Sequence, residues 1–258
     1  GAGMMDCKNA LVEANGDFEL AIENLRKKGQ KVAAKRADRD SSEGAVIAMV
    51  NDDQTKGVII SLNCETDFVA KNESFVDLAK SFCKIALNCS SLEELLNSTH
   101  ESMTVSEKLI EQTGVIGEKL EIGAFESVSS EHVGFYIHAG NKIATLAGLS
   151  NKFENVSDVS KNVAMQVAAM NPIALNEDSV SKEIIEKEIE IAKEQLRAEG
   201  KPEAMLDNIA KGKLKKFFKD NTLVKQAYIK DNKSSVENYI QSENNECVIT
   251  DFKRVALV

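Results

Sequence analysis

A pair of strand-like runs followed by one amphipathic helix occurs twice in this 258-residue chain, and this repeat limits the fold more than any other feature. In the first copy, residues 45–50 and 58–62 are rich in β-branched side chains and flank the turn-forming residues 51–57. This pattern predicts a β-hairpin. A helix is then predicted from about Asn72, because apolar residues recur three and four positions apart. Its apolar face consists of Phe75, Leu78, Phe82, Ile85 and Ala86.

The second copy lies downstream. Residues 134–138 and 142–149 predict a second hairpin around the turn at 139–141, followed by a helix that ends before Pro172. The apolar face of that helix consists of Val159, Val163, Val167 and Met170. A shift of 81 residues (158 minus 77) matches Asp158 to Asp77, Val159 to Leu78, Lys161 to Lys80 and Val163 to Phe82. Two related hairpin-plus-helix halves therefore predict an α+β core.

Residues 177–221 have a different pattern and predict an inserted helical hairpin. The break at 200–202 separates two apolar stripes with steps of three and four. The stripes consist of Ile185, Ile189, Ala192 and Leu196, then Leu206, Ala210, Leu214 and Phe217. Because so narrow a stripe suits contact with one other helix, we expect an antiparallel coiled coil that projects from the body. The five lysines between 211 and 219 favour the helix dipole and are expected to be solvated.

The N-terminal region predicts a small helical module. Residues 4–15 form a short helix ended by Gly16, and Asp17 caps a second helix that we expect to end at Gly29. Residues 26–40 are charged and are expected to form a solvated linker, with a nucleic-acid-binding arm as the alternative. Two helices this short do not close a core, so a third helix is expected upstream of Gly1. The predicted units are 1–40, 41–128, 129–176 with 222–258, and the insertion 177–221.

Composition excludes several classes of protein. Thirty-two basic against 41 acidic residues give a net charge of −9, which argues against a protein that coats nucleic acid. No apolar run reaches the roughly 18 residues of a membrane span. The five cysteines lack a CxxC pair and the three histidines lack metal-ligand spacing, so we expect reduced cytoplasmic thiols and no metal. No glycine-rich phosphate loop occurs, and no bound nucleotide or other cofactor is expected.

The segment from Cys64 to Asn72 joins a predicted strand to a predicted helix. Its Phe68 either folds back into the core or protrudes as an aromatic probe. Cys64 with His138 as base would make a thiol enzyme, but no local motif marks such a pair, and we expect no enzyme.

Two long motifs resemble the bacterial elongation factor Ts family. Residues 1–11, GAGMMDCKNAL, together with 13–17 and 21–26, resemble its N-terminal module, and residues 63–72, NCETDFVAKN, resemble its central signature. The similarity in layout extends over essentially the whole chain. It implies a UBA-like N-terminal module, two related core subdomains and an inserted coiled-coil hairpin.

The resemblance also implies a function. Members of the family are guanine nucleotide exchange factors for elongation factor Tu, the GTPase that carries aminoacyl-tRNA to the ribosome. By resemblance, Asp67 and Phe68 reach the GTPase domain of this partner. The flanking residues Thr66 and Val69 are implied contacts as well. Phe68 then wedges between helices, disturbs the magnesium site and the phosphate loop, and releases GDP. Further implied contacts are Met4, Met5 and Lys8 on the N-terminal module, His138 on the first strand of the second hairpin, and Tyr228 with Ile229.

The chain departs from the family's sequence pattern at two places. Gly123 and Ala124 stand where the family often has two arginines, and Ala227 replaces a frequent proline. The contacts of those arginines and the rigidity of the segment around Ala227 therefore do not carry over from the resemblance. A non-catalytic adaptor that binds proteins is the alternative function. Relatives form two-plus-two assemblies with the partner, and a dimer of this chain is possible; no contact with nucleic acid or membrane is expected.

Overall fold

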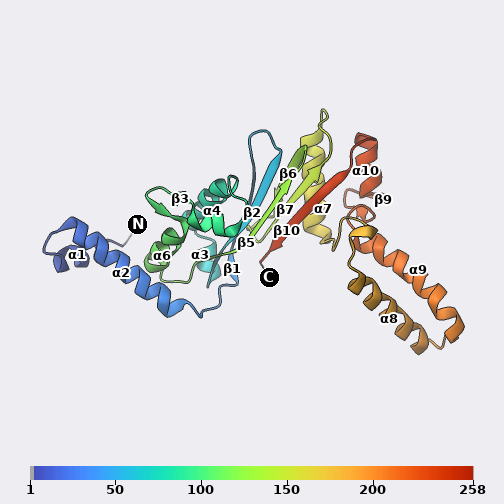
Figure 1. The fold of residues 1–258 in the computed structure, drawn as a ribbon, viewed down its shortest axis with the longest axis horizontal. Coiled ribbons are helices and arrows are strands. Elements are labelled where there is room, and N and C mark those ends of the chain that lie inside the picture. The colour runs from blue at the N-terminus through green and yellow to red at the C-terminus, as the bar shows by residue number, and fades with distance from the viewer. Residues whose placement is uncertain (1–2, 258) are drawn as a thin grey trace.

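The computed structural model describes residues 3–257 and shows an elongated molecule built around two antiparallel sheets (Figure 1). The first sheet has the strand order β1-β2-β5 and the second the order β10-β7-β6. Their strands are β1 (Glu43–Val50), β2 (Lys56–Cys64), β5 (Glu121–Ser129), β6 (His132–Ile137), β7 (Ile143–Leu149) and β10 (Ile249–Ala256). The coarse prediction of an α+β fold is confirmed.

The two sheets pack face to face, and the apolar layer between them is the centre of the molecule. This layer consists of Val46, Ala48, Ile59, Val128, Val133, Ala144 and Leu146. Close approach requires a residue without a side chain at Gly57, where a Cβ would lie 2.7 Å from a methyl carbon of Leu146. Because β1 and β2 are covered on both faces, their sequences are nearly continuous apolar runs instead of alternating ones.

Helices cover the outer faces of both sheets. Helix α4 (Glu73–Ala86) packs Phe75 and Phe82 against the first sheet, and α7 (Val156–Met170) with α10 (Val236–Glu243) covers the second. The predicted helix start at Asn72 is present, since its side chain accepts a hydrogen bond from Ser74 N at 3.0 Å. Met170, which we expected on the buried face of α7, is 45% exposed at the helix end.

The two sheets share one topology. In each, a hairpin is followed by a helix, and a later third strand pairs with the second strand of the hairpin. The segments inserted before the third strand differ. The first contains α5 (Leu92–Asn97), β3 (Thr99–His100), β4 (Met103–Thr104) and α6 (Val105–Ile116). The second contains η1 (Glu177–Ser179), α8 (Lys182–Ala198), α9 (Glu203–Asn221), β8 (Ala227–Tyr228), β9 (Asp231–Ser235) and α10.

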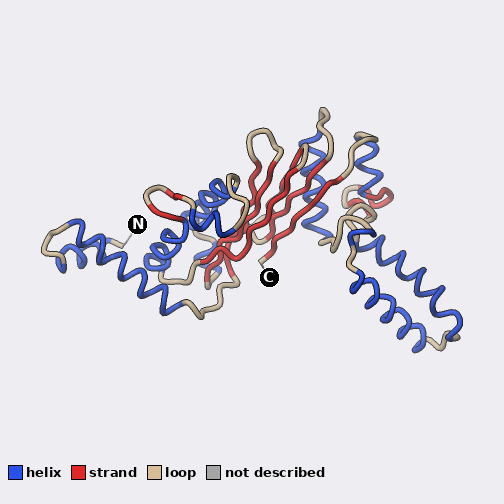
Figure 2. The backbone as a smooth tube through the Cα atoms, viewed as in Figure 1, coloured by secondary structure: helices blue, strands red, loops and turns tan. Residues whose placement is uncertain are grey.

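Helices α8 and α9 form a hairpin that points away from the sheets (Figures 1 and 2). Leu196 and Leu206 are buried between its two arms. Lys193 Nζ lies 2.8 Å from Asp207 Oδ1, and Arg197 pairs with Glu203 near the turn. Part of the apolar stripe is therefore buried within the hairpin. At its base, Phe218 packs with Ala174 and Val180. Ile184, Ile191 and Met205 of the hairpin remain exposed.

At the other end of the molecule, the prediction of a linker over residues 26–40 is wrong. Helix α1 (Met4–Glu13) is followed by α2 (Phe18–Arg36), which continues through Gly29 for two more turns (Figure 1). Gly29 does not end the helix because it lies at the crossing of α2 and α6. A Cβ on Gly114 of α6 would lie 2.6 Å from Gly29 Cα, so both glycines permit close contact between the helix backbones.

Several short elements were not predicted. Helix α3 (Asp67–Ala70) has four residues, and α10 and the β8–β9 pair lie in polar sequence with few apolar positions. Tertiary contacts hold the last two: α10 buries Val236 and Ile240 in the core of the second sheet, and Gln166 bonds to the β8–β9 segment. Among residues 3–257, no helix combines the length and apolar character needed to cross a membrane.

The glycine crossing generates a stability prediction. Gly114→Ala should lower the free energy of unfolding by about 1–3 kcal/mol, because the new methyl group overlaps the α2 backbone. The control is Gly212→Ala in α9, where a Cβ would meet nothing within 4 Å. That change should raise the free energy by roughly 0.5–1 kcal/mol through better helix propensity. Thermal and urea unfolding followed by circular dichroism measures both; equal effects would contradict the crossing.

Candidate functional site

The most exposed aromatic ring of the described residues belongs to Phe68, whose side chain is 84% exposed. It lies on α3, a single turn between β2 and α4. Thr66 caps this turn, since its side chain accepts from Val69 N, and Lys71 Nζ lies 2.6 Å from Asp67 Oδ2. The ring protrudes from the body, which is the second of the two interpretations of Phe68 given above. The segment therefore presents an apolar ring next to the carboxylate of Asp67.

Two carboxylates hold the residues just before α3. Glu118 Oε2 accepts from Glu65 N at 3.1 Å and from Thr66 N at 3.0 Å, and Glu118 Oε1 accepts from Thr66 Oγ1 at 2.6 Å. Glu65 in turn accepts from Lys119 N at 2.7 Å and from Arg36 Nη1 at 2.8 and 2.9 Å. We call Arg36, Glu65, Thr66, Glu118 and Lys119, with the hydrogen bonds between them, the 65–118 lock. These contacts could not be predicted from the sequence. Those of Glu65 with Glu118 and Lys119 join residues that are separated by 53 and 54 positions along the chain, and no periodic pattern links residues so far apart.

Neighbouring groups favour the charged forms of Glu65 and Asp67. The hydrogen bond from Lys119 N and the Arg36 guanidinium lower the pKa of Glu65, against a smaller upward effect of burial. The side-chain hydrogen bond from Lys71 likewise lowers the pKa of Asp67. Glu65 and Asp67 therefore remain ionised at neutral pH.

Beneath α3, Cys64 is fully buried and its thiol faces Thr66 O at 3.2 Å. Burial, with the nearby Glu118 carboxylate, raises the pKa of Cys64 to about 12. A thiol in this state is not nucleophilic. His138 lies at the end of β6, where its Nδ1 is 3.1 Å from the Tyr136 hydroxyl, and is not bonded to Cys64. The structure thus gives no support to a thiol enzyme.

The N-terminal module exposes the residues that the resemblance implies. Met4 is 88% and Met5 63% exposed on α1, and Lys8 is exposed one turn later. Only a small core joins α1 to α2, through Ala10, Ala14 and Ala21. A partner role for these three side chains remains a prediction.

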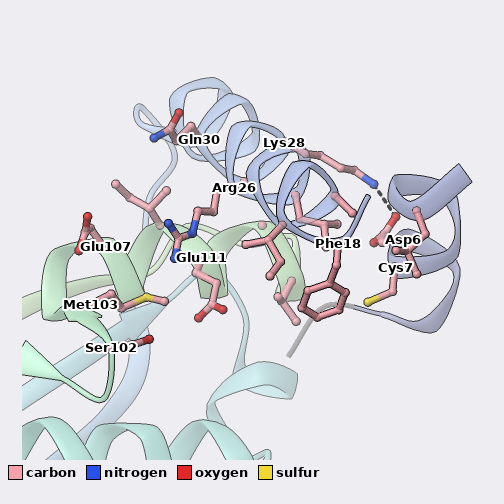
Figure 3. Close-up of a pocket in the computed structure, with 18 residues that line it drawn as sticks. Asp6, Cys7, Phe18, Arg26, Lys28, Gln30, Ser102, Met103, Glu107 and Glu111 are labelled. Atoms are coloured by element: carbon pink, nitrogen blue, oxygen red, sulfur yellow. Dashed lines mark hydrogen bonds and ion pairs between the residues drawn. The ribbon is translucent and has the colours of Figure 1, made fainter. Parts of the chain in front are cut away.

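A cavity of about 500 Å³ lies between the N-terminal module and α6, beside the contact of Gly29 with Gly114 (Figure 3). At one end Asp6 and Lys28 form an ion pair of 2.5 Å, close to Cys7 and Phe18. At the other end lie Met103, Glu107 and Glu111. The apolar part of the lining consists of Leu11, Phe18, Ala21, Ile22, Leu25, Met103, Ile110 and Val115.

Of the predicted contacts in the last third of the chain, Tyr228 does not fit. It is 5% exposed, and its ring stacks on Tyr239 with centroids 4.1 Å apart, so it belongs to the core beneath α10. A contact role for the Tyr228 ring disagrees with this burial. Its neighbour Ile229 is 39% exposed and His138 is exposed, so both are free to touch another protein.

Buried amides fix the segment that carries Ile229. Gln166 Oε1 accepts from Ile229 N at 2.8 Å, and Gln166 Nε2 donates to Ala227 O at 3.1 Å and to Gln226 Oε1 at 3.2 Å. Gln226 Nε2 donates to Asp220 O at 3.2 Å, at the end of α9. The segment is thus held without the proline that Ala227 replaces.

The other departure from the family pattern has a packing reason. Gly123 is the extra residue in β5 where the pairing with β2 shifts between Ser61 and Leu62. A Cβ there would lie 2.7 Å from the Asn63 side chain, which donates to Ser41 O at 2.9 Å. In the described part of the chain, no three His, Cys, Asp or Glu side chains are grouped so as to hold a metal ion.

The state of Cys64 is testable by alkylation. At pH 8 a thiol with a pKa of about 12 has roughly a thousandfold less thiolate than one with the ordinary value of 9.0, so iodoacetamide should leave Cys64 unmodified in the folded protein. In guanidinium chloride the same cysteine should react readily. Peptide mass spectrometry, with Cys64→Ala to assign the peptide, measures both; fast labelling of the folded chain would contradict the burial.

Comparison with known proteins agrees with this architecture. Residues 65–257 match the sequence model of the family described as Elongation factor TS. The elongation factor Ts of Christiangramia forsetii is 66% identical over 257 residues, which cover 100% of this chain and 94% of that protein. The proteins of the same name from Flavobacterium psychrophilum and Amoebophilus asiaticus are 63% and 50% identical, over 100% and 99% of this chain and 94% and 93% of theirs. The chain belongs to the elongation factor Ts family.

Proposed function

We propose that this chain is a guanine nucleotide exchange factor for elongation factor Tu, and that it releases GDP by inserting Phe68 between helices of the GTPase domain. The observation that carries the proposal is the exposure of Phe68, 84%, on a turn that the 65–118 lock holds to the body of the protein. A large apolar side chain held out in water gains free energy when a partner covers it. Family membership supports the identity of that partner.

The proposed mechanism is differential binding. The factor must bind the empty or distorted GTPase more tightly than the GDP-loaded form, and by reciprocity it then weakens GDP binding by the same factor. No bond is made or broken, so the chain needs no nucleophile, metal or nucleotide of its own. Its place of action would be the cytoplasm, where translation occurs.

One side chain is not sufficient. Burial of a phenylalanine yields roughly 1.5–3 kcal/mol, whereas a 10⁴-fold shift of an equilibrium needs about 5.5 kcal/mol. Further contacts must therefore favour the same state. We propose that Asp67, Thr66 and Val69, which lie beside the ring, supply this preference. We also propose a second group that binds elsewhere on the partner and adds affinity for both states. This second group consists of Met4, Met5, Lys8, His138 and Ile229.

Phe68→Ala tests the proposal directly. Catalytic amounts of the wild-type chain should accelerate release of labelled GDP from elongation factor Tu, and the variant should reduce this acceleration by at least about tenfold. The control is Phe18→Ala, which removes a ring that is 69% exposed on α2 and should leave the rate unchanged. Stopped-flow fluorescence measures both. A stable complex with an unaltered GDP release rate would instead indicate a non-catalytic adaptor.

The methionines should act differently from Phe68. Met4→Ala with Met5→Ala should raise the factor concentration needed for half-maximal exchange and leave the maximal rate nearly unchanged. The reason is that contacts remote from the nucleotide contribute equally to both states of the GTPase. The same stopped-flow assay over a range of factor concentrations separates the two quantities. A lowered maximal rate at saturation would contradict this assignment.

A further inference from the structure

We propose that Glu118 is a positioning residue for Phe68: it fixes the backbone from which the ring projects, and exchange depends on it although it need not touch the partner. This inference rests on the proposed exchange function. It concerns a residue on a different element, at the α6–β5 connection, far from Phe68 in sequence.

The first argument is the hydrogen bonding of the segment. The pairing of β2 ends at Cys64, so the next two amide groups lie beyond the sheet ladder. Glu118 accepts from both of them, Glu65 N and Thr66 N, and from the Thr66 hydroxyl as well. Hydrogen bonds to a charged acceptor are about twice as strong as neutral ones. One carboxylate therefore holds three consecutive donors immediately before α3.

The second argument is that the connection is reciprocal. Glu118 reaches the backbone at 65 and 66, while Glu65 reaches back to Lys119 N. Gly117 ends α6 in the left-handed conformation, with a φ of 81°, and so directs Glu118 toward β2. Arg36, at the end of α2, closes the arrangement with two hydrogen bonds to Glu65. The ends of α2 and α6 therefore meet at the base of the Phe68 turn.

The third argument is that α3 cannot fix Phe68 by itself. A helix of four residues lies far below the length at which helices are stable in water. With 84% of its surface exposed, the Phe68 ring gains little from its own subunit. If the turn were free to move, ordering it on binding would cost conformational free energy and weaken the wedge. The lock removes that cost in advance.

The first experiment compares Glu118→Gln with Glu94→Gln. A glutamine at 118 has one acceptor oxygen and directs an NH₂ group at the remaining donors. We expect about a tenfold loss in the rate of catalysed GDP release, with the melting temperature little changed. Glu94 is a matched control, because its carboxylate also accepts from a backbone amide and a hydroxyl group. The donors are Ser90 N and Ser90 Oγ, both at 2.7 Å. Glu94→Gln should leave the rate unchanged, and equal rates for both variants would overturn the proposal.

The second experiment asks whether Glu118 acts through Phe68. Against a Phe68→Ala background, Glu118→Gln should cause no further loss, because there is no ring left to position. Additive losses would overturn the proposal, since Glu118 would then contribute by another route. If Phe68→Ala alone leaves exchange unchanged, the proposed function fails. If Phe68→Ala slows exchange and Glu118→Gln does not, this inference alone fails.

A variant of Thr66 tests the same contact if Glu118→Gln folds poorly, and amide hydrogen exchange provides a second measurement if it folds. Thr66→Val removes only the hydroxyl donor to Glu118 Oε1 and the cap of α3, and Thr66→Ser restores both. We expect the valine variant to slow exchange and the serine variant to recover it. Amide hydrogen exchange at Thr66 and Phe68 should accelerate in Glu118→Gln but not in Glu94→Gln. Unchanged protection at these amides would overturn the positioning role.

Discussion

The packing of the two sheets against each other determines where every other part of this protein lies. The layer formed by Val46, Ile59, Val133 and Leu146 needs both sheets, because neither sheet alone covers both of its faces. Gly57 shows how close the contact is, since a methyl group there would overlap Leu146. Helices α4 and α7 then cover the outer faces, and the shared strand order produces two equivalent halves. The large clusters of buried apolar side chains lie in this central body, while Met4, Met5 and Phe68 are exposed on segments at its periphery.

The candidate site is built where the ends of two peripheral helices meet the end of the central strand of the first sheet. The end of β2, the end of α6 and the end of α2 converge at residues 65 and 66 through Glu118 and Arg36. The N-terminal helices and the Phe68 turn are thus connected, although they belong to different predicted units. A factor that must act on several surfaces of one partner benefits from such a connection, because contacts fixed relative to each other bind together at a lower entropic cost.

Near the base of the α8–α9 hairpin, polar side chains again fix a backbone segment, and here they are the neutral amides of two glutamines. Gln166 and Gln226 are buried and bond to each other, to the segment carrying Ile229 and to the last turn of α9. Helices α8 and α9 bury Leu196 and Leu206, and at the base of their hairpin Phe218 packs with Ala174 and Val180. In both places an exposed apolar residue lies on a backbone fixed by buried or half-buried polar side chains.

Local sequence patterns determined the elements with a strong period or a clear turn. Both hairpins, α4, α7 and the α8–α9 hairpin follow from spacing and from turn and cap residues at Asn72 and 200–202. Tertiary contacts decided the rest. The sequence pattern predicts a helix end at Gly29, but the helix continues there and Gly29 lies against Gly114 of α6. The family resemblance implies a partner contact at Tyr228, but its ring stacks on Tyr239. The lock between residues 65 and 118 also depends on chain segments more than 50 residues apart. Sequence determines which groups are apolar, charged or helix-forming, but burial and hydrogen-bond partners across the chain exist only once the sheets have packed.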